Sequence, residues 1–398
     1  MLQKKLLQWA EKVREHSNIQ ARFVLWNGKH LDLGHFEAPP VTLHIKDPSF
    51  ISDLLAPSMS KLGEAYVRGK VDFEGKLSDI IELGFSIARS VHVNKLRFFT
   101  DYFPHTRKSD LQSIQFHYDV SNEFYKLWLD PNMVYSCAYF ENGDETLEAA
   151  QIKKIDYILT KIQLQPGQTL LDIGCGWGAL VLRAAEKFDA KCVGITLSKN
   201  QCALAQERVK TAGLEDRIEI RLQDYRDVSG KFDRITSVGM FEHVGRKNLV
   251  EYFRIIHDLL VDDGIAMNHG ITSVSTDMKD TNLGASDFID KYIFPNGELP
   301  HVGQAISALQ EGGLEVFDAE NLRRHYARTL SIWADNFEKH ADAVKQHIDP
   351  ERYRAWRLYL AGCAYSFMHD QMSIYQLVCH KADRMADTIP WSRRYMYD

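Results

Sequence analysis

The stretch LLDIGCGWGAL, residues 170–180, has three glycines directly after an apolar run. The apolar run is typical of a buried strand, and the segment after the last glycine is typical of a helix. Gly174, Gly176 and Gly178 would let the backbone turn tightly and come close to a ligand. The N–H groups of the first helical turn would add hydrogen-bond donors at the same place. The stretch therefore predicts a strand–turn–helix unit that binds a nucleotide.

The glycine spacing alone leaves two classes of ligand open. Read as G-x-G-x-x-A, it fits the dinucleotide fingerprint. Read as D-x-G-x-G-x-G, it fits S-adenosylmethionine (SAM), with Asp172 placed to hold the ammonium of an amino-acid moiety. The next strand ends in GITLSKNQ, residues 194–201, without the acid that usually binds the ribose of a dinucleotide. Asp224 and Tyr225 follow a third strand, where they could hold adenine, so SAM is favoured.

Strand and helix patterns alternate along this part of the chain. Strands are expected within 168–176, 190–198, 217–225, 232–240 and 264–270, with helices between them. This alternation predicts an α/β fold with a mainly parallel sheet and helices on both faces. Residues 271–312 break the alternation and are interpreted as an insertion after the fifth strand. Two last strands are expected at 314–322 and 372–382.

Residues 1–90 predict a separate, small α+β unit. Residues 2–14 have the apolar spacing of an amphipathic helix, which could dock on its own domain or lie on anionic lipid. Asn27-Gly28 predicts a hairpin turn between two short strands. Residues 91–110 are interpreted as a linker.

Composition excludes several classes of function. The 398 residues are 45% hydrophobic and 26% charged, which is typical of a globular protein with a packed core. The net charge of −6 and the lack of a long basic run argue against binding of nucleic acid. There is no CxxC or HExxH motif, so we expect no metal site and reduced thiols. The six scattered cysteines are Cys137, Cys175, Cys192, Cys202, Cys363 and Cys379.

The N-terminal residues do not have the pattern of a signal peptide. No apolar run reaches the roughly 20 residues that a membrane-spanning helix needs. We therefore expect a cytoplasmic protein that could contact the membrane from its inner face.

Several longer segments together resemble one family. They are FHYDVSNEFYKLWL (116–129), VYSCAYF (134–140), VGMFEHVG (238–245) and YIFPNGELP (292–300), beside the two nucleotide stretches. The set resembles the cyclopropane-fatty-acyl-phospholipid synthases, SAM-dependent enzymes that are related to the mycolic acid cyclopropane synthases. The resemblance covers roughly residues 60–390. KLGEAYVRGKVDFEG (61–75) is also similar to the N-terminal domain of members that act on phospholipids.

The resemblance implies a class I SAM-dependent methyltransferase fold, with a mostly parallel seven-stranded sheet and a lipid-binding cap. It implies an N-terminal domain at 1–90 for lipid or membrane docking, a linker at 91–110, and a catalytic domain at 111–398 whose cap lies at about 271–312. Gln201 takes the place of the usual strand-end acid, so an amide would bind the ribose region. The predicted SAM-binding residues, from the glycine stretch and the resemblance together, are Tyr118, Tyr135, Ser136, Asp172, Gly174, Gly176, Thr196, Leu197, Gln201, Asp224 and Tyr225.

In the family a bound bicarbonate ion is taken to be the catalytic base. The resemblance places its holders at Cys137, Glu242, His269 and Tyr326, with a backbone contact at Ile271. Glu242 would accept a hydrogen bond from the bicarbonate hydroxyl, and His269 and Tyr326 would donate. We interpret His243 as part of a helix start, because the family ligand matches His269. Cys137 is not favoured as a nucleophile, since no basic partner lies near it in sequence.

Methyl addition to an unactivated alkene requires a dry, well-oriented site and leaves a carbocation, and ring closure then requires a base. The implied reaction is formation of a cyclopropane ring on an unsaturated phospholipid acyl chain, by an enzyme that contacts the membrane peripherally and forms a homodimer. A methylene- or methyl-branched product remains the nearest alternative. A methyltransferase for a small soluble acceptor and a non-catalytic lipid-binding protein also remain open.

Overall fold

The computed structural model describes residues 2–16, 18–91, 106–107, 113, 120–276, 283–383 and 389–397. The chain forms two compact units, each made of segments that are distant in sequence. The first, here called the four-stranded unit, comprises Met1–Tyr102, Ser275–Pro295 and Ala341–Gln371. The second, the seven-stranded unit, comprises Phe103–Val274, Asn296–His340 and Met372–Asp398. Most of the linker expected at 91–110 lies outside the described residues.

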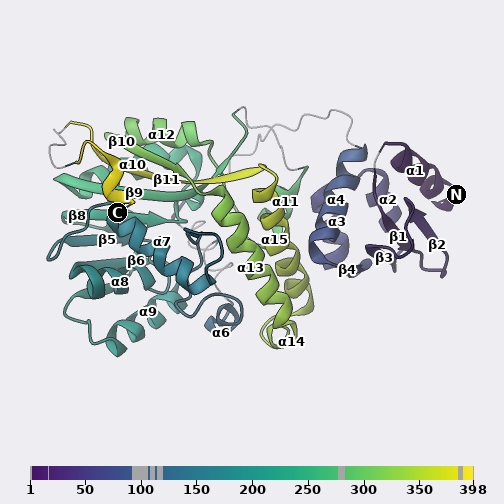
Figure 1. Cartoon of the computed structure of the whole chain (residues 1–398), viewed down its shortest axis with the longest axis horizontal. Helices are drawn as coiled ribbons and strands as arrows, with labels where there is room; N and C mark the ends of the chain where they lie inside the picture. The colour runs from purple at the N-terminus through teal and green to yellow at the C-terminus, as the bar shows by residue number, and fades with distance from the viewer. Residues whose placement is uncertain are drawn as a thin grey trace. The chain divides into compact units, whose positions relative to one another are not determined.

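The seven-stranded unit is built on a sheet with the order β10-β11-β9-β8-β5-β6-β7 (Figure 1). All neighbours from β9 to β7 are parallel, whereas β11 is antiparallel to both β9 and β10. This arrangement confirms the predicted α/β class with a mostly parallel seven-stranded sheet. The strands are β5 (Thr169–Ile173), β6 (Lys191–Thr196), β7 (Ile218–Leu222), β8 (Phe232–Val238), β9 (Leu260–Ser273), β10 (Leu314–Asn321) and β11 (Met372–Lys381).

Neighbouring side chains along each strand enter two separate hydrophobic cores, one on each face of the sheet, because strand side chains alternate between faces. Leu170 packs in one core and Leu171 in the other, and Met267 and Ala266 divide in the same way. The first core is closed by α7 (Leu147–Lys161), α8 (Ala179–Phe188) and α9 (Lys199–Thr211). The second is closed by α10 (Leu249–Leu259) and α12 (Val302–Glu311). Figure 1 shows these two helical layers.

The residues expected to form the cap at 271–312 take several roles. β9 continues to Ser273, and residues 277–282 lie outside the described part of the chain. Helix α11 (Ala285–Tyr292) packs within the four-stranded unit. Helix α12 buries Ala305 and Leu309 in the second core of the sheet, so it acts as an ordinary covering helix.

Aromatic rings join the short helix α6 (Asn122–Lys126) to α13 (Arg323–Lys339). The ring centroid of Trp128 lies 5.7 Å from that of Trp333. Tyr135 contacts both rings, at 5.4 Å from Trp128 and 5.3 Å from Trp333. Tyr326 approaches the same Trp333 ring edge-on, at 6.0 Å. These rings form a buried aromatic wall beside the loop that precedes α7.

The four-stranded unit has the sheet order β2-β1-β3-β4. β1 (Ala21–Val24) and β2 (His30–Leu33) pair antiparallel across the predicted Asn27-Gly28 turn. β3 (Val41–Ile45) and β4 (Val71–Gly75) complete the sheet. Its helices are α1 (Leu2–His16), α2 (Phe50–Leu55), α3 (Met59–Val67), α4 (Leu77–Val91), α11, α14 (Ala341–Val344) and α15 (Pro350–Met368).

Helix α1 uses its apolar face inside its own unit. Leu6, Trp9 and Val13 are each 4% exposed or less and join the core under the sheet. These side chains therefore dock the helix on its own domain, which is the first of the two roles predicted for it.

Late segments of the chain complete the four-stranded unit. Ile81 and Phe85 of α4 pack against Ala361 and Tyr365 of α15. The stacked rings of Phe85 and Tyr365 have centroids 4.6 Å apart.

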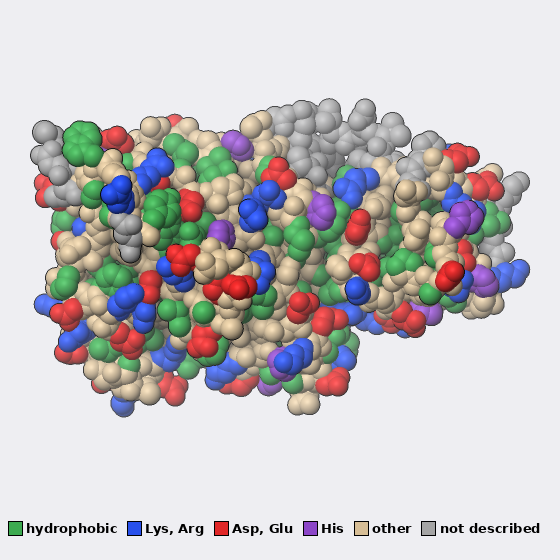
Figure 2. Space-filling view, in the orientation of Figure 1, with side chains coloured by type: hydrophobic (Ala, Val, Ile, Leu, Met, Phe, Trp, Pro, Cys, Tyr) green, Lys and Arg blue, Asp and Glu red, His purple; other side chains and the backbone are tan. Residues whose placement is uncertain are grey.

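On the described surface drawn in Figure 2, basic and acidic side chains are interspersed. Among the described helices we find none with the length and hydropathy needed to cross a bilayer.

The segment after β8 is held against β9 by a contact that only glycine permits. A Cβ atom added at Gly270 would overlap the ring of Phe241. Phe241 is 1% exposed and begins the short 3-10 helix η2 (Phe241–His243). This close approach fixes the path of the chain on which Glu242 lies.

We expect Gly270→Ala to lower the free energy of unfolding by roughly 1–3 kcal/mol or more, because the added methyl group must displace a buried ring. Chemical denaturation measures this change. Gly362→Ala in α15 is the control, since its Cβ would meet nothing within 4 Å. It should leave stability unchanged or raise it by roughly 0.5–1 kcal/mol. Equal stability of the wild type and Gly270→Ala would contradict the contact.

Candidate active site

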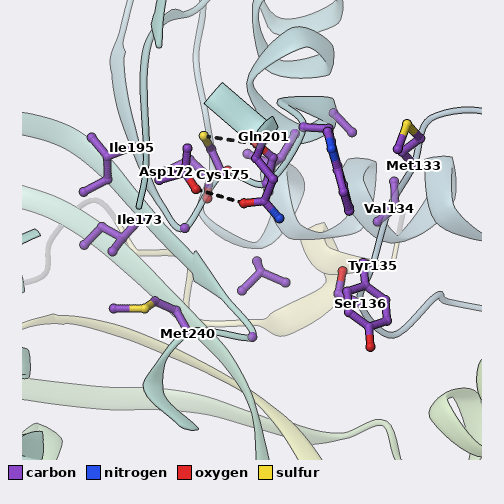
Figure 3. Close-up of a pocket in the computed structure, with 18 of the residues that line it drawn as sticks. Met133, Val134, Tyr135, Ser136, Asp172, Ile173, Cys175, Ile195, Gln201 and Met240 are labelled. Carbon is purple, nitrogen blue, oxygen red and sulfur yellow. Dashed lines mark hydrogen bonds between the residues drawn. The ribbon is translucent and has the colours of Figure 1, made fainter. Parts of the chain in front are cut away.

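A cavity lies at the carboxyl ends of β5, β6 and β8, where open α/β sheets bind their ligands. Figure 3 shows the loop with Tyr135 and Ser136 on one side and Asp172, Ile173 and Ile195 on the other. Nine of the predicted SAM-binding residues line this cavity: Tyr135, Ser136, Asp172, Gly174, Gly176, Thr196, Leu197, Gln201 and Tyr225.

Backbone hydrogen bonds fix the glycine turn against β6. The N–H groups of Gly174 and Cys175 both donate to the carbonyl oxygen of Ile195, at 2.9 Å. Gly174 has φ of +81°, in the left-handed region that favours glycine. Helix α8 begins at Ala179, directly after the turn, and Ala179 itself lines the cavity. The backbone thus approaches the ligand space without an intervening side chain.

A second turn, from β6 into α9, orients Gln201. The Thr196 hydroxyl hydrogen-bonds Gln201 Oε1 at 2.9 Å. Ser198 caps α9 by accepting from the N–H of Gln201. Because the amide oxygen of Gln201 is occupied, its Nε2 group is the part that can donate to a ribose hydroxyl.

Asp172 places a buried carboxyl group in the cavity wall. It is 3% exposed, and its Oδ1 accepts a hydrogen bond from the Thr236 hydroxyl at 2.8 Å. Burial raises its pKa to about 6, although the Thr236 hydrogen bond and the charge of Lys154 act in the opposite direction. At pH 7 the group is therefore mostly ionised and can attract a cationic ligand.

Helix α7 holds the loop that faces the strand ends. Gln151 Nε2 donates to the carbonyl oxygen of Ser136 at 2.8 Å. One helical turn later, Lys154 Nζ donates to the Ser136 hydroxyl at 2.7 Å. Burial lowers the pKa of Lys154 to about 8. Lys154 also lines the cavity, together with Ser136 and Asp172.

Two predicted SAM contacts are placed differently. Tyr118 lies outside the described residues. Asp224 is not part of the cavity lining, and its two carboxylate oxygens accept hydrogen bonds from the Arg226 guanidinium at 2.9 and 2.7 Å. The neighbouring Tyr225 does line the cavity.

Behind the cavity wall lies a buried polar cluster, defined here as Glu242, His269 and Gln376. Glu242 Oε1 accepts from the N–H of Ile271 at 2.7 Å, and burial raises the pKa of this glutamate to about 7. His269 is fully buried, which lowers its pKa well below the usual range. Gln376 on β11 contacts His269 Nδ1 at 3.2 Å. Val238, which lines the cavity, is paired with His269 in the sheet.

Cys137 and Tyr326 are connected to this cluster through Leu322. The Cys137 thiol lies 3.8 Å from the carbonyl oxygen of Leu322, which also accepts from the N–H of Tyr326. The N–H of Leu322 donates to Ile374, the sheet partner of Ile271. The predicted bicarbonate holders are thus gathered on neighbouring segments of one unit. Burial raises the pKa of the Cys137 thiol, so it is neutral at pH 7.

Sequence reasoning missed four residues of this region: Gln151, Lys154, His243 and Gln376. Lys154 lies four residues from both Ala150 and Ile158, so its place on an apolar stripe was a usable signal. His243, interpreted as a helix start, lies in a short 3-10 helix and lines the cavity. Gln376 had no local signal, because its partner is 107 residues away.

The strand order, the glycine turn after β5 and the cavity at the strand ends define a class I SAM-dependent methyltransferase. The sequence model of the mycolic acid cyclopropane synthetase family matches residues 105–377. The chain belongs to this family. Residues 8–95 match a separate domain of unknown function.

Individual relatives support this placement. A protein of Pseudomonas putida named "probable fatty acid methyltransferase" is 43% identical over 96% of this chain and 97% of its own length. The cyclopropane-fatty-acyl-phospholipid synthase of Escherichia coli K12 is 37% identical over 85% of this chain and 87% of its own. The crystal structure of mycolic acid cyclopropane synthase CmaA1 with SAH and CTAB is 38% identical, with a TM-score of 0.65 over 68% of this chain and 98% of that one.

The pKa of Asp172 gives a prediction for ligand binding. Its ionised form, present above about pH 6, attracts the cationic groups of SAM, and protonation removes this attraction. Affinity for SAM should therefore fall about tenfold between pH 7 and pH 5, with about half of the ionised form already lost at pH 6. Isothermal titration calorimetry from pH 5 to 7.5 measures the change.

Asp172→Asn should bind SAM at least roughly tenfold more weakly at pH 7 and show a flatter pH profile. Asp189→Asn is the matched control, because Asp189 is exposed and pairs with Arg217 away from the cavity. Identical pH profiles for the wild type and Asp172→Asn would rule out this role.

Proposed function

We propose that the chain transfers the methyl group of SAM to the cis double bond of an unsaturated phospholipid acyl chain and then closes a cyclopropane ring. One arrangement carries the proposal. A buried acid, Glu242, and a buried neutral imidazole, His269, stand directly behind the strand end that lines the SAM cavity. Proton removal from a reaction intermediate requires groups of this kind next to the methyl donor.

The relatives support an acyl-phospholipid substrate. The E. coli phospholipid synthase matches 85% of this chain, whereas the mycolic acid synthase CmaA1 matches 68%. The larger match extends into the region before residue 105, which the family model does not cover. The structure of CmaA1 is a complex with both SAH and CTAB, which supports binding of an amphiphile in addition to the methyl donor.

The aromatic wall suits a cationic intermediate. Transfer of the methyl group to one alkene carbon forms a carbon–carbon bond, releases S-adenosylhomocysteine and leaves positive charge on the other alkene carbon. The ring of Tyr135 can stabilise such charge without reacting with it, and Trp128 and Trp333 contact that ring. Tyr135 also lines the SAM cavity, so the wall begins where the methyl group would be delivered.

The polar cluster fits a small oxyanion such as bicarbonate. Within the described part of the chain, Glu242 Oε2 and His269 Nε2 are buried polar atoms without a hydrogen-bond partner. The Gln376 amide nitrogen contacts His269 Nδ1, so Nε2 carries the imidazole proton and can donate. An oxyanion with one hydroxyl group would satisfy both atoms, because it accepts from His269 and donates to Glu242.

When bound there, bicarbonate would supply a base that takes the proton lost in ring closure. The chain's own residues would orient it. Glu242, fixed by the N–H of Ile271, would accept from its hydroxyl. His269, fixed by Gln376, would donate, and Tyr326 would contribute its phenol from α13.

The predicted membrane and assembly partners follow from the family. We propose peripheral contact with the inner face of the membrane and a homodimer. A methylene- or methyl-branched product is the alternative that the P. putida relative's name favours, because fatty acid methyltransferases need not close a ring.

The proposal predicts turnover with purified protein, SAM and vesicles of dioleoyl phosphatidylglycerol and dioleoyl phosphatidylethanolamine. Proton NMR of the extracted lipid should show the far-upfield signal of a cyclopropane ring. A vinylidene signal would instead identify the methylene-branching reaction. Vesicles of dipalmitoyl lipids, which have no double bond, are the control. Turnover with a soluble acceptor and none with vesicles would contradict the proposal.

The proposed roles also predict a ranking of two variants. Glu242→Ala should lower kcat by at least about a hundredfold, since it removes the acceptor for the base. Cys137→Ser should retain most activity, because a hydroxyl can replace the neutral thiol near the Ala138 and Leu322 carbonyls. Turnover in the vesicle assay measures both, and SAM affinity serves as the check on folding. A larger loss in Cys137→Ser than in Glu242→Ala would reverse the assignment.

A further inference from the structure

Lys154 places a buried ammonium group in the wall of the SAM cavity. It is 2% exposed, and its Nζ donates to the Ser136 hydroxyl at 2.7 Å. Lys154 lines the cavity, as do its hydrogen-bond partner Ser136 and the acid Asp172. Fastening of the loop does not by itself require a cation, because Gln151 already binds the loop's backbone with a neutral amide.

The charge of Lys154 is only partly compensated within the protein. Its hydrogen-bond acceptor, Ser136, is neutral. The nearby carboxylates are engaged by other donors: Asp130 by the N–H groups of Asn132 and Val134, and Asp172 by Thr236. A buried ammonium is costly unless an anion is close to it. A ligand that brings an anionic group to this end of the cavity would supply that partner.

Both ionisable groups are mostly charged at neutral pH. The pKa of Lys154 is about 8 and that of Asp172 about 6, so each is about nine-tenths ionised at pH 7. Each also stabilises the charge of the other. The cavity lining therefore presents one cation and one anion, which together are the complement of a zwitterion.

We propose that Lys154 binds the carboxylate of the methionine portion of SAM, while Asp172 binds its ammonium group. The two residues together would recognise the zwitterionic end of the ligand and set the position of the sulfonium methyl. This inference rests on SAM being the methyl donor in the proposed function.

A purely structural role for Lys154 would have a different signature. If the lysine only fastened the 133–136 loop through Ser136, its removal would weaken every ligand of the cavity to the same extent. If it binds the ligand carboxylate, its removal would weaken SAM but not decarboxylated SAM, which lacks that group. The ratio of the two affinities separates these roles.

The test is isothermal titration calorimetry of SAM and decarboxylated SAM at pH 7 with the full-length chain. The wild type should prefer SAM by about tenfold or more, which is the usual effect of one charged hydrogen bond. Lys154→Met should reduce the preference to less than about threefold. Lys153→Met is the matched control, because the side chain of the neighbouring Lys153 is 44% exposed and pairs with Glu141 at 2.9 Å. It should keep the wild-type preference.

The outcomes distinguish this inference from the proposed function. A wild type that binds SAM and turns over lipid, but prefers SAM less than about threefold, overturns the role of Lys154 alone. An unchanged preference in Lys154→Met does the same. A wild type that binds neither ligand overturns the proposed function as well. If Lys154→Met does not fold, Lys154→Arg decides, because it keeps the charge and should keep the preference, and a lost preference overturns the inference.

Discussion

The hydrogen bond from the N–H of Ile271 to Glu242 ties the end of β8 to β9 inside the protein. The Gly239 N–H donates to the carbonyl of His269 at 2.8 Å, and the Phe241 ring lies on Gly270, so the same two segments are joined at successive points. These contacts hold the backbone from Val238 to His243 in a fixed position against β9. One side of this segment lines the SAM cavity, and the other presents the polar cluster, so the two halves of the proposed chemistry share a wall.

Burial gives this wall its electrostatic character. The pKa values of Asp172, Glu242 and Lys154 are about 6, 7 and 8, and all three groups are shifted toward neutrality mainly by loss of solvent. His269 is held in its neutral form for the same reason. Groups with shifted pKa values that meet at one cavity are typical of sites that bind charged ligands or move protons. The ionisation of each group also depends on the charges near it, because interactions between charges are stronger in a low-dielectric surrounding.

Local sequence signals predicted the fold well. The glycine turn, the alternation of strands and helices, and the two last strands are properties of short segments, and the structure contains each of them. The cavity residues that follow strands, such as Asp172 and Gln201, were also accessible, because a parallel sheet collects its strand ends at one edge. Glu242 and His269 were assigned from the family resemblance, and their catalytic roles stay predictions.

Other features depend on contacts between distant segments and could not be read locally. Lys153 and Lys154 are adjacent in sequence, yet the side chain of Lys153 is 44% exposed and Lys154 is 2% exposed, because α7 turns only the second toward the loop that contains Ser136. Gln376 comes next to His269 only because β11 pairs with β9 in the folded sheet. The packing of α12 against the sheet could not be read from its sequence either, because an amphipathic pattern does not show which surface the helix covers.

The four-stranded unit is built from distant segments of the chain, so its N-terminal part cannot be removed without exposing the rest of the unit. The unit includes α11 and α15, which lie between β9 and β11 in the sequence, and Ala361 and Tyr365 pack there on α4. A truncation that deleted the first hundred residues would turn these side chains toward water, and exposed apolar surface of this kind promotes aggregation. The amino-terminal region therefore covers apolar side chains of α15, and the two segments must be kept together for this core to stay buried.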